Sequence, residues 1–182
     1  IILGCIYRPK ILKNNKGVMC DKDVHIERDN KINESIGLAG DLVKSGKYKG
    51  LIVGGDFNFN EITWNEFLEP AVIGDSEAAD KFIDTLDSRF LTQNIYFKTF
   101  QRQSGMTNTL DLVITENKER VYGLVETPAL GNLESGHIGI GWNYALASNK
   151  DKNGGGPCFK KNKYNYKTGD YTGMKAYFKQ LN

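Results

Sequence analysis

The chain has 182 residues, of which 25% are charged, 40% hydrophobic and 11% aromatic, with a formal net charge of +2 at pH 7. This length suits one domain with a sizeable core, and the composition argues against a disordered chain. No apolar stretch reaches the roughly 20 residues of a transmembrane helix, and no signal-peptide pattern opens the sequence. Three widely spaced cysteines without a C-x-x-C pair argue against a disulfide framework or a zinc knuckle. We therefore expect an intracellular protein, nuclear or cytoplasmic.

The first elements follow from apolar spacing. Residues 1–7 are apolar on both faces, which predicts a strand in a buried sheet. A polar loop over 10–22 leads to helical spacing over about 24–45. A short buried strand over 51–53 then runs into Gly54-Gly55-Asp56-Phe57-Asn58.

The middle of the chain predicts a loop, a helix and several closely spaced strands. Residues 60–75 have the character of a loop, and apolar residues recur every four positions in a helix over 77–93. Strands are predicted at about 95–97, 110–115, 121–126 and 137–142. Because no helix separates these strands, the order predicts a mixed α/β (α+β) domain rather than a doubly wound parallel sheet.

The net charge conceals two unlike parts. Residues 150–182 carry +6 and residues 1–149 carry −4. The glycine-rich stretch 149–157 predicts a linker, and 170–181 predicts a short helix. We therefore expect a domain over 1–148 and a basic linker and tail over 149–182. The lysines and aromatic residues of the tail could contact nucleic acid, but a solvated linker is the favoured interpretation.

The strongest local signal for chemistry is the pair Asp56 and Asn58 after a buried strand and two glycines. Glycines let the backbone approach a ligand closely, and α/β sheets place ligands at such strand ends. Asp56 could hold a water or a cation, and Asn58 could donate to a phosphate oxygen. The alternative is an ordinary Asp/Asn turn that caps a loop.

Three more residues are candidates because of where they lie in predicted strands. Asp111 is a carboxylate within an apolar strand, which is costly unless the group is paired. His137 begins a strand, and a buried carboxylate is the natural group to orient a histidine base. Tyr7 ends the first strand and could donate to a phosphate oxygen. Each residue alone could equally be structural.

Taken in order, four segments resemble the endonuclease/exonuclease/phosphatase superfamily: Ile6-Tyr7-Arg8-Pro9, Val53-Gly54-Gly55-Asp56-Phe57-Asn58, Leu110-Asp111-Leu112-Val113 and Ser135-Gly136-His137. The nearer resemblance is to the apurinic-like endonuclease domain of non-LTR (LINE-type) retrotransposon proteins. It implies a four-layered α/β sandwich that cleaves phosphodiester bonds with Mg²⁺. It also implies DNA as the partner, with a reverse transcriptase domain following in the parent protein.

The resemblance also implies roles for the candidate residues. Tyr7 would contact the scissile phosphate, and Asp56 would position or deprotonate the attacking water. Asn58 would steady the developing charge, and Asp111 would orient His137 for phosphate binding or proton transfer.

Two departures from the family pattern concern the metal. Gly136 stands where the family usually has a metal-binding aspartate, and the family's metal-binding glutamate would precede Ile1. We therefore expect the N-terminal part of the domain to be missing, no metal ligand to be retained, and the chain to be inactive. The alternatives are a non-catalytic nucleic-acid-binding remnant and a superfamily phosphatase acting on another phosphate ester.

Overall fold

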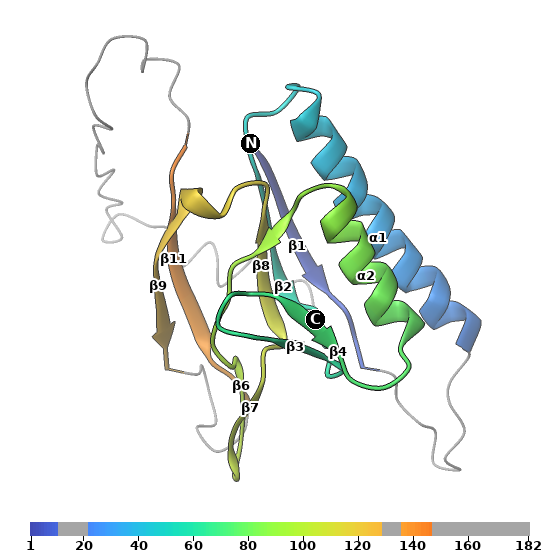
Figure 1. Ribbon diagram of the computed structural model, residues 1–182. Helices are drawn as coiled ribbons and strands as arrows, with labels where there is room; N and C mark the ends of the chain where they lie inside the picture. Colours follow the sequence, from blue (N-terminus) through green and yellow to red (C-terminus); the bar gives the residue numbers. More distant parts are fainter. Residues whose placement is uncertain (11–21, 129–135, 147–182) are drawn as a thin grey trace, which may run out of the picture. The chain divides into compact units, whose positions relative to one another are not determined.

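The structure is a computed structural model that describes residues 1–10, 22–128 and 136–146 (Figure 1). These residues belong to one unit, which spans Ile1–Ala147. The predicted linker and tail over 149–182 lie outside the described residues.

Two α-helices, α1 (Lys22–Lys44) and α2 (Glu77–Ser88), lie side by side (Figure 1). Helix α2 begins after Ser76, whose hydroxyl accepts a hydrogen bond from the Ala79 amide at 3.3 Å, as expected of a helix N-cap. It ends earlier than predicted because Phe90 has a φ of 55° and is 77% exposed, so it does not continue the buried face. Within the described residues, neither helix combines the length and apolar character of a membrane span.

Four strands form the main sheet in the order β1-β2-β8-β5, where β1 is parallel to β2 and the other pairs are antiparallel. They are β1 (Ile2–Tyr7), β2 (Leu51–Asp56), β8 (Asp111–Thr115) and β5 (Thr92–Gln93). Three smaller groups are β10 (Gly136–His137) with β6 (Phe100–Arg102) and β7 (Gly105–Asn108), β11 (Gly139–Tyr144) with β9 (Val121–Thr127), and β3 (Ile62–Trp64) with β4 (Pro70–Val72). A 3₁₀ turn, η1 (Lys118–Arg120), precedes β9. The prediction of a mixed α/β fold is confirmed at this level.

Side-chain alternation gives the main sheet two different faces. Leu51 and Val53 are buried in the core shared with the helices, where Phe82 is fully buried. Ile52 and Gly54 point to the opposite face. On that face, Ile52 and Gly54 line a cavity of about 480 Å³, which Ile140 and Trp142 of β11 also line. The helices therefore cover one face of the sheet, and the other face is available for a site.

The predicted buried strand over 1–7 is wrong in its environment. Strand β1 forms at the predicted place, but among the described residues it pairs only with β2 and is the edge of the sheet. Leu3 is 71% exposed as a result. Within the part of the chain that the structure describes, this apolar run therefore forms an edge strand.

Two further predictions differ from the structure, and one hairpin was not predicted. Residues 95–97 form no strand, because pairing with β8 stops at Gln93. The predicted loop over 60–75 contains the hairpin β3–β4, and β6–β7 form a second hairpin that was not predicted. All these strands have two to four residues, too few for a two-residue period to be distinct.

Candidate active site

The ends of neighbouring strands bring the predicted acids together. Asp56 ends β2 and Asp111 begins β8, and the antiparallel register makes them direct partners. Asp56 shares the parity of Ile52 and Gly54, so its side chain lies on the face away from the helices. His137 reaches the same place from β10.

The histidine is held between the two carboxylates. Its Nδ1 lies 2.8 Å from Asp111 Oδ2. Because an ionised carboxylate only accepts hydrogen bonds, Nδ1 carries a proton and donates a hydrogen bond to Asp111. This leaves Nε2 facing Asp56, with 3.6 Å between Nε2 and Asp56 Oδ2. All three side chains are partly buried. The arrangement matches the predicted pairing of a buried acid with a histidine, and Nε2 is free for proton transfer.

The segment from Asp56 to Phe59 alternates between core and site. Phe57 and Phe59 are buried against Phe82, with ring centroids 5.3 and 4.7 Å away. The intervening Asn58 has a φ of 50°, and its amide Nδ2 donates to Asp56 Oδ2 at 2.7 Å. Its backbone N–H donates to Asp56 Oδ1 at 3.1 Å. The phenylalanines therefore anchor the turn, and Asn58 fixes the carboxylate.

The environment of Asp56 disfavours its charged form. Burial raises the pKa of Asp56, and the neighbouring Asp111 carboxylate raises it further. The charge of His137 and the hydrogen bonds from Asn58 lower it, but the net pKa lies above its ordinary value. Such a perturbed carboxyl beside a histidine is typical of functional sites.

Thr99 connects Asp111 to His137 and was not selected from the sequence as a site residue. Its buried hydroxyl oxygen accepts hydrogen bonds from the amides of Leu110 and Asp111, both at 2.9 Å. Its carbonyl accepts from the Ile138 amide at 2.9 Å, next to His137. The Phe100 ring packs edge-on against the imidazole, with centroids 4.9 Å apart. One short segment therefore places both members of the acid–histidine pair.

Three of the site residues have donor atoms suited to a cation. One oxygen each of Asp56 and Asp111 and one nitrogen of His137 lie within 4.8 Å of one another. Mg²⁺ is commonly held by one or two carboxylates while it keeps several waters, so the two acids fit it. Gly136 adds no ligand, and its φ of 155° lies in a region that favours glycine.

A family described as endonuclease-reverse transcriptase matches residues 23–140, which is more than half of the chain. The chain belongs to the endonuclease-reverse transcriptase family. This membership confirms the resemblance to the endonuclease/exonuclease/phosphatase superfamily and its retrotransposon branch. Comparisons with curated proteins and with solved structures gave no match.

The region that matches the endonuclease-reverse transcriptase family includes Asp56, Asn58, Asp111 and His137 but not Tyr7. Tyr7 is the backbone partner of Asp56 in the β1–β2 register and is 71% exposed. Its side chain lines a groove beside α1 with Val24 and Glu27. Within the described part of the chain, it makes no hydrogen bond to the other four predicted residues. The structure therefore brings together four of the five and leaves Tyr7 beside them.

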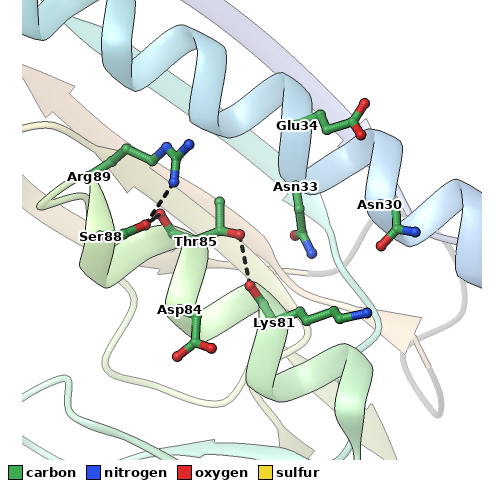
Figure 2. A pocket seen from close by; sticks show the side chains of 8 residues that line it. All are labelled: Asn30, Asn33, Glu34, Lys81, Asp84, Thr85, Ser88 and Arg89. Atoms are coloured by element: carbon green, nitrogen blue, oxygen red, sulfur yellow. Dashed lines mark hydrogen bonds between the residues drawn. The ribbon is translucent and has the colours of Figure 1, made fainter.

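A second hollow, of about 360 Å³, lies between α1 and α2, on the other side of the sheet from the acid–histidine cluster (Figure 2). Its lining mixes acidic, basic and neutral polar side chains, among them Glu34, Asp84 and Lys81. Arg89 crosses α1 where glycine leaves room, since a Cβ at position 37 would lie 2.8 Å from its Nε. This hollow results from the way α1 and α2 pack against each other. The acid–histidine cluster remains the candidate active site of the family domain.

Proposed function

We propose that the chain is the DNA-nicking endonuclease domain of a retrotransposon-like reverse transcriptase protein, with a phosphodiester bond as its target. The observation that carries this proposal is the Asp111–His137 hydrogen bond of 2.8 Å, which turns Nε2 toward Asp56. In this proposal, His137 moves a proton at Nε2 and Asp56 positions the attacking water. The exposed Tyr7 contacts the phosphate, while the buried Asn58 holds the Asp56 carboxylate in place. The family likeness further supports the four-layered α/β sandwich as the parent fold and a reverse transcriptase domain as its partner.

A divalent cation belongs to the same proposal for an electrostatic reason. Asp56 and Asp111 put two carboxylates at one place, and a phosphodiester anion brought to them would be repelled. Mg²⁺ held by these carboxylates would cancel that repulsion and stabilise the charge that develops on the phosphate. His137 keeps Nδ1 on Asp111, so the two carboxylates would hold the cation and Nε2 remains for proton transfer.

We further propose that the chain as it stands cleaves DNA poorly or not at all. Gly136, next to His137, supplies no carboxylate, and its backbone conformation disfavours a side chain. The site then has the groups for proton transfer but a weak hold on the metal.

Mn²⁺ added to the full chain should broaden the imidazole NMR signals of His137 much more than those of His25, the other histidine. The reason is that Mn²⁺ is paramagnetic and the only metal donor group found among the described residues includes His137. The double variant Asp56→Asn, Asp111→Asn should lose this selective broadening. Equal broadening of both histidines, or broadening that survives in the double variant, would contradict the site.

Supercoiled plasmid incubated with the full chain and Mg²⁺ should be nicked no faster than with Asp56→Ala or His137→Ala, because the metal is held weakly. Gly136→Asp adds the missing carboxylate and should give nicking that chelation of Mg²⁺ abolishes.

The control for that assay is Gly136→Asn. Asparagine has nearly the same shape as aspartate and is equally disfavoured by the backbone conformation at position 136, but it carries no charge. Nicking by the unaltered chain that disappears in Asp56→Ala would overturn the proposed inactivity. A folded Gly136→Asp protein that nicks no more than Gly136→Asn would overturn the missing carboxylate at position 136 as the cause of the inactivity and favour a non-catalytic binding module.

A further inference from the structure

Next to the candidate site lies a buried ion pair, Arg8 with Asp29, that is not part of the acid–histidine cluster. Asp29 lies within the residues that match the family, and Arg8 precedes them. The side chains of Arg8 and Asp29 are only 5% and 10% exposed. Arg8 Nε donates to Asp29 Oδ1 at 3.0 Å, and Nη2 donates to Oδ2 at 2.9 Å. This two-point contact fixes the guanidinium in one plane and orientation.

Among the described residues, Arg8 also contacts the turn that carries Asp56. Its Nη1 donates to the carbonyls of Asn58 at 3.2 Å and Phe57 at 3.4 Å. Its guanidinium carbon lies 3.9 Å from the centroid of the Phe59 ring. In return, Nδ2 of Asn58 donates to the Arg8 carbonyl at 2.8 Å. Every residue from Phe57 to Phe59 therefore touches Arg8.

Asn58 needs such support because its backbone has a φ of 50°, which non-glycine residues adopt at a cost. Nδ2 of Asn58 is shared between the Arg8 carbonyl and Asp56 Oδ2. A change in the position of Arg8 therefore changes the hydrogen bond that fixes the carboxylate of Asp56.

Stability alone gives little reason for this pair. Buried ion pairs often contribute no more than well-packed apolar residues of the same size. The pair is nevertheless kept charged. Burial raises the pKa of Asp29, but the hydrogen bonds and charges of Arg8 and Arg28 outweigh it and hold the pKa below its ordinary value.

We propose that Arg8 and Asp29 are a positioning pair, which holds the Asp56–Asn58 turn so that the Asp56 carboxylate faces His137. This inference rests on the proposed function for its purpose, while its geometry stands without it. Neither residue touches the reacting groups, and both act through Asn58.

Arg8→Lys is the decisive variant, because lysine keeps the charge but cannot bind Asp29 and the two carbonyls at once. Arg28→Lys is its matched control. Arg28 also donates to Asp29, at 2.7 Å, but its other contacts are with Pro9 and His25 and not with the turn. The first measurement needs no metal and follows solvent exchange of the Asn58 side-chain amide protons by NMR. Arg8→Lys should speed this exchange at least about tenfold over Arg28→Lys, because the Asn58 side-chain amide becomes more accessible to solvent.

The second measurement is the apparent Mn²⁺ affinity from the broadening of His137. Arg8→Lys should weaken it about 10–100-fold, the usual effect of losing a group that orients a metal ligand, and Arg28→Lys should leave it within about threefold. If the unaltered chain shows no selective Mn²⁺ binding, the proposed function fails while the amide exchange still tests the positioning pair. Equal exchange in folded Arg8→Lys and Arg28→Lys proteins would overturn the inference.

Discussion

Gly55→Ala is expected to lower the free energy of unfolding by about 3 kcal/mol or more, as backbone strain and overpacking act together. A Cβ at this position would lie 1.9 Å from the carbonyl oxygen of Ile6, which is backbone and cannot turn away. Gly55 also has a φ of 145°, a conformation that is essentially restricted to glycine. The clash falls within the β1–β2 ladder, one residue before the partners Tyr7 and Asp56.

The neighbouring glycine provides the control. A Cβ at Gly54 would meet only the Leu112 carbonyl oxygen, at an ordinary 3.7 Å. Urea unfolding should therefore show Gly54→Ala close to the unaltered chain and Gly55→Ala far below it. Equal losses in the two variants would mean that the effect comes from removing any glycine from β2.

The elements that could be predicted are those whose own residues determine their place. Helices α1 and α2 were found because their apolar spacing repeats over enough residues to show its period, and β2 was found because a short apolar run leads into two glycines. The turn after β2 was recognisable because an acid and a carboxamide follow a buried strand and two glycines. Phe57 and Phe59 alternate with Asp56 and Asn58, so the core fixes which residues face the site.

The hairpins β3–β4 and β6–β7 could not be predicted, because their strands have only three or four residues and show no clear period. Strand β6 has three residues, and its pairing with β10 joins residues more than thirty positions apart. An apolar strand such as β1 has the same sequence pattern at an edge as in the middle of a sheet.

The same distinction applies to the site. Asp56, Asp111 and His137 were noticed because charged or polar groups at the ends of apolar strands need an explanation. Arg8 and Thr99 raise no such question in the sequence, since their importance lies in contacts 11 to 50 residues away along the chain. A buried arginine or threonine becomes a candidate only when its hydrogen-bond partners are known.

Thr99→Val should lower the free energy of unfolding by about 2–5 kcal/mol, because two buried amides lose their acceptor at once. Valine has almost the shape of threonine, so packing changes little and the loss reports on the hydroxyl. The amides belong to Leu110 and Asp111, which makes the start of β8 the place where the structure loosens. Thermal and urea unfolding give the magnitude.

Thr99→Ser is the matched control, since serine keeps the hydroxyl and removes only a methyl group. Its free energy of unfolding should fall by about 1 kcal/mol, the usual effect of deleting one buried methyl group. If Thr99 also aligns Asp111 with His137, Thr99→Val should weaken Mn²⁺ broadening of His137 and Thr99→Ser should not. Equal effects of valine and serine on both stability and metal binding would show that Thr99 acts by packing alone. A larger effect of valine on both would make its hydroxyl the link that lets β8 and β10 present their acid and histidine as one unit.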